Sequence, residues 1–488
     1  MLKVLLRPLN ANLINEGKIL MFDLLKYKTH TAVITDRGEQ LSYEELDVQA
    51  SQFAKVIKEN ALLFCLCENR LGSFVGYMAC MEHHIPIVLL DGSKDMSVLQ
   101  NLVSIYQPEY IWAETRRASE MGGETIYTYA SYSLHKMKYE VSVEKPAINP
   151  ELALCLTTSG STGSPKFVRL SAKNVLANAE SIAEYLEIDE NERPVTILPS
   201  YYSYGVSVIN SHLIKGATIL LTDGTIAQRD FWNFMKEQKA TSIAGVPYTY
   251  EILKKLRVVR MDLPYLKTMT QAGGKLNKDI AKEYIEWAQS KDKRFFVMYG
   301  QTEATARMSY LPLEHALDKY ASIGIAIPGG KFSLMDVNGN VIEESDVDGE
   351  LIYEGPNVSL GYAECRADLA KGDENHGVLH TGDVARRDAD GYYYITGRMK
   401  RFVKVWGNRC NLDATEQLVK AVITSCACVG VDDKITIFVT QEGLEESIIK
   451  LLVEKTGFNN RAFEVRVIDA IPVKSSGKID YQVMQNMI

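Results

Sequence analysis

The chain lacks the sequence features of several large classes of protein. Its 488 residues carry a net charge of −8, which disfavours general attraction to nucleic acid or to an anionic membrane. No run approaches the roughly 18 uninterrupted apolar residues of a membrane-spanning helix. The first 25 residues contain no continuous apolar core and no small-residue cleavage site, so we expect no signal peptide. These absences predict a cytoplasmic protein with no nucleic-acid partner and no integral membrane contact.

Cysteine spacing typical of a disulfide framework or of a cysteine-based metal site is missing as well. The eight cysteines form no CxxC pair. We therefore expect buried free thiols in a reducing compartment. The composition, with 46% hydrophobic and 24% charged residues, is that of a globular protein with a sizeable core.

Alternating strand and helix patterns predict an α/β protein. Apolar strand-like segments at 62–66 and 85–90 flank a helical pattern at 73–83, which is typical of a parallel sheet covered on both faces. The same alternation continues further along the chain. The later strand-like segments lie at 152–157, 196–198, 218–221, 242–246, 268–272 and 295–298.

The pattern also predicts how the chain divides into domains. From residue 322, short alternating strands are separated by Asn-Gly and Asp-Gly turns, which indicates a small β-rich subdomain at about 322–398. We expect this subdomain to belong to a large N-terminal domain, 1–398, built from parallel-rich sheets with flanking helices. Residues 399–488 are predicted to form a small, mobile α+β domain.

Residues 158–166 read TSGSTGSPK, the most informative segment of the chain. Its glycines allow tight turns, and its hydroxyls, amide N–H groups and one lysine can converge on a phosphate. A strand pattern precedes it and a helical pattern at 171–187 follows, so we expect the loop at a strand end that feeds a helix. It is not a Walker A loop, because Pro165 precedes Lys166 and Phe167 follows it. A flexible linker, the alternative, rarely ends in Pro-Lys.

Five later segments carry polar groups suited to a nucleotide. They read AGGK at 272–275, YGQTE at 299–303, TGD at 381–383, GRMK at 397–400 and PVKSSGK at 472–478. The glycine pair lets the backbone approach a flat ligand, and YGQTE offers an aromatic ring, a hydroxyl and a carboxylate suited to a base, a phosphate and Mg²⁺. TGD is expected at a strand end, where a carboxylate suits ribose hydroxyls. Each segment alone usually marks a turn.

Together, and in this order, the motifs resemble the adenylate-forming superfamily of acyl-CoA synthetases, luciferases and peptide-synthetase adenylation domains. The resemblance covers essentially the whole chain. It implies that ATP and Mg²⁺ bind, with Thr302 at the α-phosphate, Glu303 on the metal and Lys478 as a mobile catalytic lysine. The residues that it assigns to ATP are Thr158, Ser159, Gly160, Ser161, Thr162, Gly163, Lys166, Gly273, Gly274, Tyr299, Gly300, Gln301, Asp383 and Arg398.

The resemblance also implies a reaction in two halves. A carboxylate attacks the α-phosphate of Mg·ATP to give an acyl-adenylate and pyrophosphate, and Lys478, Thr302 and Mg²⁺ stabilise the charge that grows on the phosphorus oxygens. A thiol then displaces AMP, so the partners are a carboxylic acid and either CoA or the phosphopantetheine of an acyl carrier protein. The C-terminal domain is expected to swing about Lys400, with Lys404 and Gly407 along the path of the thiol.

The chain departs from the family pattern at positions that bear on the substrate. Tyr202 takes the place of a usual His, and Phe167 takes that of a usual Gly. Gly205 aligns with an Asp that pairs with the ammonium group in amino-acid-activating relatives. Because a buried ammonium without a carboxylate is strongly disfavoured, Gly205 argues against an α-amino acid. The residues expected near the acid are Tyr202, Tyr204, Gly205, Ser207, Asn210, Val246 and Lys275.

Several alternatives stay open. Lys275 either pairs with a second anionic group of the substrate or is a surface lysine. Glu416 alone is left of a usual Glu-x-Glu, since Ala414 replaces the first acid, and we interpret it as structural. An amino-acid–carrier-protein ligase is the second enzyme hypothesis. A catalytically silent nucleotide-binding relative is disfavoured, because the chemical residues are all present: Lys166, Glu303, Asp383, Arg398 and Lys478.

Overall fold

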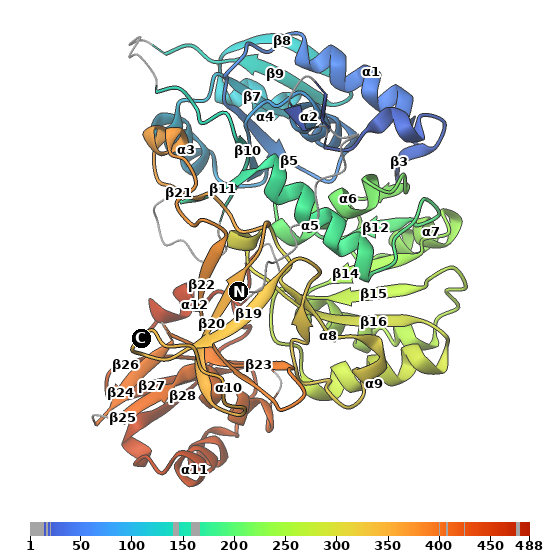
Figure 1. The fold of residues 1–488 in the computed structure, drawn as a ribbon. Coiled ribbons are helices and arrows are strands. Elements are labelled where there is room, and N and C mark those ends of the chain that lie inside the picture. The colour runs from blue at the N-terminus through green and yellow to red at the C-terminus, as the bar shows by residue number, and fades with distance from the viewer. Residues whose placement is uncertain are drawn as a thin grey trace. The chain divides into compact units, whose positions relative to one another are not determined.

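The computed structural model describes residues 14–15, 18–19, 21–139, 146–157, 166–399, 401–406, 408–423, 425–474 and 479–488. The chain divides into two compact units (Figure 1). The first contains residues 1–320, 326–331 and 354–379, and the second contains residues 321–325, 332–353 and 380–488. The boundary expected at 398/399 falls within the second unit and stays a prediction.

The first unit contains a sheet of eight strands in the order β21-β11-β10-β6-β5-β7-β9-β8. Its central strands β10, β6, β5 and β7 are parallel, and antiparallel strands flank them. The parallel sheet predicted from the strand–helix alternation is thereby confirmed, because parallel neighbours need crossover connections. The strands are β5 (Leu63–Cys67), β6 (Ile87–Asp91), β7 (Tyr110–Glu114), β8 (Glu124–Tyr129), β9 (Tyr132–Lys136), β10 (Leu152–Thr157), β11 (Phe167–Ser171) and β21 (Gly361–Ala363).

A second sheet has nine strands in the order β18-β17-β16-β15-β14-β12-β13-β3-β4. Its strands from β16 to β3 are all parallel, so their carboxyl ends share one edge. The strands are β3 (Thr31–Thr35), β4 (Gln40–Ser42), β12 (Pro194–Thr196), β13 (Ile219–Leu221), β14 (Ser242–Gly245), β15 (Thr268–Gln271), β16 (Arg294–Tyr299), β17 (Ser309–Tyr310) and β18 (Ile325–Ala326).

Helices between these two sheets create one continuous hydrophobic core (Figure 1). Apolar residues of α2 (Leu71–Glu82) and α6 (Ser203–Leu213) pack in this core with Leu63 and Leu89 of one sheet and Ile219 of the other. The other helices of this unit are α1 (Tyr43–Ala54), α3 (Met96–Tyr106), α4 (Thr115–Met121), α5 (Ala172–Tyr185), α7 (Arg229–Glu237), α8 (Pro247–Lys255) and α9 (Lys278–Ser290).

The second unit is built from smaller sheets. Four strands pair in the order β19 (Lys331–Met335), β20 (Asp348–Glu354), β22 (Val378–Arg387) and β23 (Tyr393–Arg398). After them come the hairpin of β24 (Phe402–Val405) and β25 (Asn408–Asn411) and the sheet of β26 (Cys426–Val431), β27 (Lys434–Val439) and β28 (Phe463–Val467). The helices are α10 (Leu412–Lys420), α11 (Glu445–Thr456) and α12 (Tyr481–Gln485).

Two local expectations were wrong. The predicted phosphate loop does not feed a helix, because β11 follows it and pairs antiparallel with both β10 and β21. Helix α5 begins only after β11. The TGD motif lies inside β22 rather than at a strand end, although Gly382 has a φ of +66°.

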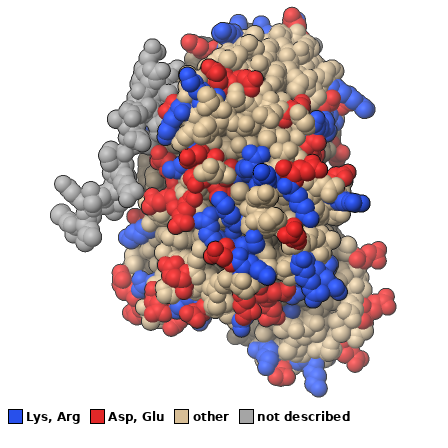
Figure 2. All heavy atoms as spheres, turned by 90° about the vertical axis from the view of Figure 1, so that its right-hand side faces the viewer, with Lys and Arg blue, Asp and Glu red and all other residues tan. Residues whose placement is uncertain are grey.

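The surface, the thiols and the helices can be compared with the composition of the chain. Across the described residues of the face in Figure 2, Lys and Arg side chains are interspersed with Asp and Glu. All eight cysteines are free, and Cys365 alone among them is exposed. No helix in the described ranges is both long and apolar enough to cross a bilayer.

Buried His212 on α6 gives the fold a testable pH dependence. Its Nδ1 donates to the Val208 carbonyl at 2.8 Å, and burial lowers its pKa to about 4. Because this value lies below the unfolded pKa of about 6.5, stability is lost as the pH falls from about 6.5 to 4. Urea unfolding of wild type should lose about 3 kcal/mol more over this interval than that of His212→Asn. Identical pH dependence in both proteins would contradict a neutral buried His212.

Candidate active site

The predicted site residues are distributed over both units, and part of them lie outside the described residues. Gly273, Gly274 and the 299–303 motif belong to the first unit, whereas Asp383, Arg398 and Lys404 belong to the second. The predicted residues outside the described ranges are Thr158, Ser159, Gly160, Ser161, Thr162, Gly163, Lys400, Gly407 and Lys478.

The YGQTE motif forms a tight loop between β16 and β17. Gly300 lies so close to the opposite side of this loop that a Cβ would stand 1.6 Å from the Ala306 carbonyl oxygen, so only glycine fits. The Ala306 amide donates to the Gln301 carbonyl at 3.2 Å. Thr305 and Ala306 have positive φ values of 61° and 115°, which are uncommon for residues with side chains. The loop therefore needs support from its surroundings.

Asn357, which is 1% exposed, provides this support from a distant segment. Its Nδ2 donates to the carbonyls of Ala304 at 2.7 Å and Arg307 at 3.2 Å. Its own carbonyl accepts from the Thr305 hydroxyl at 2.6 Å. These bonds satisfy buried carbonyls at the end of the loop and hold its shape.

The supported loop presents Thr302 and Glu303, which are only partly buried. Thr302 Oγ1 lies 3.0 Å from the hydroxyl of Ser203, the first residue of α6. The Glu303 carbonyl accepts from the Ser359 amide at 2.9 Å, and Glu303 Oε1 accepts from the Tyr362 hydroxyl at 2.9 Å. Both side chains are thus oriented by hydroxyl groups of other elements.

Tyr362 connects this carboxylate to the end of the predicted phosphate loop. The pairing of β11 with β21 brings Lys166 to the same place, with its Nζ 3.6 Å from the centroid of the Tyr362 ring. Lys166 Nζ also lies 3.7 Å from Glu364 Oε1. Burial and then the Glu303 charge raise the pKa of Tyr362, so its hydroxyl stays protonated and donates. One tyrosine therefore contacts both the Lys166 cation through its ring and the Glu303 carboxylate through its hydroxyl.

The glycine pair lies at the same edge of the second sheet. β14, β15 and β16 are parallel neighbours, so the residues that follow them, Val246, Gly273 and Gly300, come from adjacent strand ends. Gly273 has a φ of +83°, and a Cβ on Gly274 would stand 3.1 Å from the Pro247 ring. Ligands of α/β proteins bind outside the carboxyl ends of such strands.

Tyrosines of α6 line the interior beside this edge. Tyr204 is buried, its hydroxyl lies 2.8 Å from Thr270 Oγ1, and its ring centroid lies 6.3 Å from that of Tyr202. Burial raises the pKa of Tyr204 to about 12, and the Arg307 charge opposes this rise. Tyr202, Tyr204 and Val246 are all buried, and residues of these types commonly line small-molecule pockets.

Other residues expected near the acid make contacts within the protein that account for the residue type at each position. Ser207 donates to the Tyr204 carbonyl at 2.8 Å, and Asn210 accepts from the Tyr77 hydroxyl at 2.8 Å. Lys275 is exposed. A Cβ on Gly205 would stand 2.2 Å from the Pro199 carbonyl oxygen. Packing alone therefore requires glycine at 205, which weakens its value as evidence about a substrate ammonium.

In the second unit, Asp383 and Arg398 face each other across β22 and β23. Asp383 is 2% exposed, and its Oδ1 lies 2.9 Å from Arg398 Nε. The Arg398 side chain is largely exposed. This geometry leaves an arginine and a carboxylate together on one strand pair, as the ribose assignment requires. Lys404 is an exposed residue of β24.

Buried Glu416 ties together the segments next to Lys400 and Lys478. The Arg401 guanidinium lies 3.4 Å from Glu416 Oε2 and 3.7 Å from the centroid of the Tyr481 ring. The Tyr481 hydroxyl donates to Glu416 at 3.0 Å. Glu416 thus anchors the residues beside both predicted functional lysines, in keeping with its structural interpretation.

Three residues of the candidate site were missed in the sequence. Ser203 orients Thr302, Tyr362 orients Glu303, and Asn357 supports the loop between them. Ser203 lies within a segment already expected near the acid, so its hydroxyl was an available signal. No local pattern marks Asn357 or Tyr362, because their roles depend on long-range contacts.

Comparison with known proteins finds a matching family and several proteins with similar sequences. The sequence model of a family described as AMP-binding enzyme matches residues 23–363. A feruloyl-CoA synthase of Amycolatopsis sp. is 27% identical over 290 residues, which cover 58% of this chain and 57% of that protein. Oxalate–CoA ligase of Arabidopsis thaliana is 28% identical over 352 residues, covering 68% of this chain and 66% of that protein. The matches thus span 57% and 66% of these relatives' lengths.

Solved structures share the fold over nearly the whole chain. The o-succinylbenzoate CoA synthetase of Bacillus subtilis in complex with its acyl-adenylate intermediate matches with a TM-score of 0.75 at 18% identity, covering 94% of this chain and 97% of that one. The same enzyme with ATP and magnesium matches with a TM-score of 0.74 at 19% identity, covering 93% of this chain and 97% of that one.

Substitutions of Tyr362 separate its two contacts. Tyr362→Phe keeps the ring beside Lys166 but removes the hydrogen bond to Glu303, so the Mg²⁺ concentration needed for half-maximal ATP binding should rise about three- to tenfold. Tyr362→Leu removes both contacts and should also weaken ATP binding at saturating Mg²⁺. Calorimetric ATP titrations at several Mg²⁺ concentrations measure both effects. Wild-type Mg²⁺ dependence in Tyr362→Phe would show that the bond does not orient Glu303 toward a metal ion.

Proposed function

Because this chain belongs to the AMP-binding enzyme family, whose model matches residues 23–363, we propose that it is an AMP-forming ligase that joins a carboxylic acid to a thiol. In the first half-reaction, a carboxylate oxygen bonds to the α-phosphorus of ATP and pyrophosphate leaves. In the second, a thiolate attacks the acyl carbon of the acyl-adenylate, and AMP leaves as the thioester forms.

The observation that carries this proposal is the placement of Lys166, Tyr362 and Glu303. Lys166 Nζ lies 3.6 Å from the centroid of the Tyr362 ring, and the Tyr362 hydroxyl lies 2.9 Å from Glu303 Oε1. The lysine offers a cation for a phosphate, and the glutamate offers a carboxylate for a metal ion. Thr302, next to that carboxylate, has its hydroxyl held near Ser203. Such preorganised groups stabilise charge on a reacting phosphate better than water does, because they need no reorientation.

The residues present fit Mg²⁺. Within the described ranges, no three or more His, Cys, Asp or Glu residues gather as a metal cage. Mg²⁺ does not need one, since it keeps several waters and commonly binds through one or two carboxylates plus substrate phosphates. Glu303 is partly buried and oriented by Tyr362, which suits this role. When bound, the ion neutralises charge on the phosphate oxygens.

Further assignments follow from the family resemblance. Lys478 would bridge the attacking carboxylate and the α-phosphate, and Asp383 with Arg398 would hold the ribose. Lys400 would be the hinge of a mobile domain that begins at 399, and Lys404 and Gly407 would line the path of the thiol.

For the acceptor we propose CoA, which the names of the relatives support: they include feruloyl-CoA synthase, oxalate–CoA ligase and long-chain-fatty-acid–CoA ligase. The phosphopantetheine of a carrier protein offers the same thiol and is the second acceptor to be tested. The free cysteines fit a reducing cytoplasm as the compartment.

An α-amino acid is disfavoured as the substrate on electrostatic grounds. The Arg307 guanidinium lies 4.9 Å from the centroid of the Tyr204 ring, inside the wall expected to face the acid. A buried cation at this place repels an ammonium group, and no carboxylate near Tyr204 offsets that repulsion among the described residues. The amino-acid–carrier-protein ligase therefore gains no support.

Replacement of Lys478 tests the proposed reaction. With a panel of carboxylic acids, wild type should exchange labelled pyrophosphate into ATP, and Lys478→Ala should slow this exchange by roughly 10² to 10³. Lys474→Ala, which changes a lysine in the same motif, is the matched control and should keep the wild-type rate. Wild-type exchange in Lys478→Ala would show that the lysine is misassigned. No exchange with any acid would favour the silent nucleotide-binding relative.

A further inference from the structure

Arg307, directly after the supported loop, is a buried cation without a matching anion. It is 1% exposed, and no carboxylate lies within ion-pair distance among the described residues. Its Nη1 has only long contacts, 3.3 Å to the Tyr185 hydroxyl and 3.5 Å to Met298 Sδ, and its Nε has no hydrogen-bond partner. Buried charges in proteins are normally paired, because desolvation of an unpaired ion is costly.

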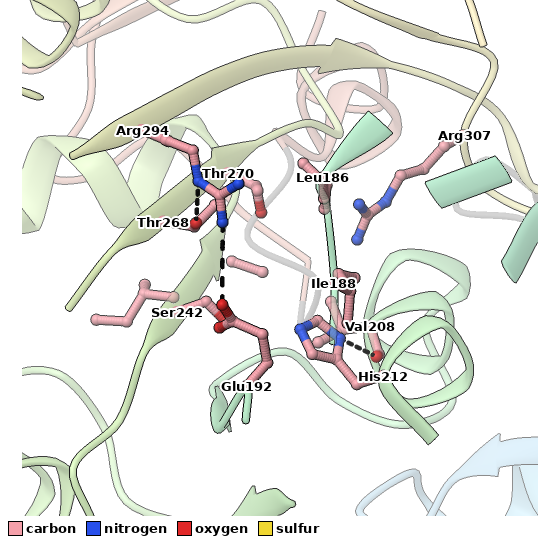
Figure 3. Close-up of a pocket in the computed structure, with 12 residues that line it drawn as sticks. Leu186, Ile188, Glu192, Val208, His212, Ser242, Thr268, Thr270, Arg294 and Arg307 are labelled. Carbon is pink, nitrogen blue, oxygen red and sulfur yellow. Dashed lines mark hydrogen bonds and ion pairs between the residues drawn. The ribbon is translucent and has the colours of Figure 1, made fainter. Parts of the chain in front are cut away.

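The guanidinium faces a cavity that has an excess of positive charge. Figure 3 shows Arg307 and Arg294 on opposite sides of this cavity, with Glu192 and His212 at its lower side. Glu192 is already engaged by Arg294 at 3.9 Å and by Lys267 at 3.7 Å. Burial lowers the pKa of His212 to about 4, so this imidazole is neutral near pH 7. No lining group is left to neutralise Arg307.

The cavity adjoins residues that contact the candidate site. It has about 20 Å³ of room for water-sized groups, and its lining includes Ala244 and Thr270. Thr270 contacts the Tyr204 hydroxyl at 2.8 Å, and Arg307 lies over the same tyrosine ring. The neighbour of Tyr204 in the chain, Ser203, contacts Thr302 at 3.0 Å. One tyrosine ring therefore separates Arg307 from the residues expected to hold the reacting carboxylate.

We propose that the acid activated by this enzyme carries a second carboxylate, which pairs with Arg307 in this cavity. The inference rests on the ligase function proposed above and names its substrate class. One carboxylate reacts at Thr302, and the other replaces the missing counter-ion of a preorganised guanidinium, whose planar fork suits a carboxylate. A monocarboxylic acid of the same length leaves Arg307 unpaired and places its apolar end against a charge.

Acid-dependent pyrophosphate exchange with matched acids tests this proposal. Saturated dicarboxylic acids of three to six carbons are compared with the monocarboxylic acids of equal carbon number. For wild type, at least one dicarboxylate should exceed its monocarboxylic partner by about 100-fold in kcat/KM. Arg307→Met, which keeps the length of the side chain but not its charge, should lose this preference and gain activity with the monocarboxylic partner. Arg307→Lys should retain part of it.

Thermal unfolding separates a substrate effect from a folding defect. Without acid, Arg307→Met should unfold at the same or a higher temperature than wild type, since an unpaired buried charge is gone. The preferred dicarboxylate should raise the unfolding temperature of wild type and not that of Arg307→Met. Equal or better turnover of monocarboxylic acids by wild type overturns the assignment of Arg307 and leaves the ligase function intact. Absence of exchange with every acid contradicts the ligase function itself.

Discussion

The buried amide of Asn357 holds the loop on which the rest of the candidate site depends. One N–H bond satisfies the Ala304 carbonyl, which would otherwise cost about 1–3 kcal/mol as a buried unpaired acceptor. The other reaches the Arg307 carbonyl, which also accepts from Asn178 Nδ2 at 2.8 Å. The Gly300 backbone closes against Ala306 with no room for a Cβ, so the loop has one compact shape. Thr302, Glu303 and Arg307 are therefore placed by a single rigid turn.

Different charged groups lie on the two sides of this turn. On its outer side, Glu303 bonds Tyr362, whose ring lies against Lys166, and these partly exposed groups suit a metal ion and phosphates. At its end, Arg307 lines a cavity whose other charged lining residues, Arg294 and Glu192, carry one charge of each sign. Under the proposed function, nucleotide and acid would meet different electrostatic surroundings on either side of one short segment.

Sequence patterns predicted the elements whose signals are local. The strand Leu152–Thr157 was found with the predicted boundaries, because the apolar pattern within the segment determines its burial. The parallel sheet was likewise predicted from the alternation of strands and helices. The YGQTE and AGGK motifs were found at one sheet edge, since both directly follow adjacent parallel strands.

Features that depend on distant pairing were not predictable in this way. β11, which lies between the predicted phosphate loop and the predicted helix, was not anticipated, and it pairs with β21, which lies nearly two hundred residues later. Asn357 contacts a residue 53 positions away, and Tyr362 contacts one 59 positions away. Gly205 looked like a substrate signal in the sequence, whereas the carbonyl of Pro199 leaves no space for any side chain there. Each of these depends on contacts that no single segment encodes.

The most direct test of this account is the rate of acid-dependent pyrophosphate exchange in Asn357→Leu. Leucine keeps the volume of the side chain but cannot donate to the loop carbonyls, so Thr302 and Glu303 lose their fixed positions. The account predicts a loss of about 100-fold in kcat/KM, with native circular dichroism. Asn149→Leu, which removes an exposed amide bonded to the Lys371 carbonyl at 2.8 Å, should keep the wild-type rate. A wild-type rate in Asn357→Leu would contradict the dependence of the site on this turn.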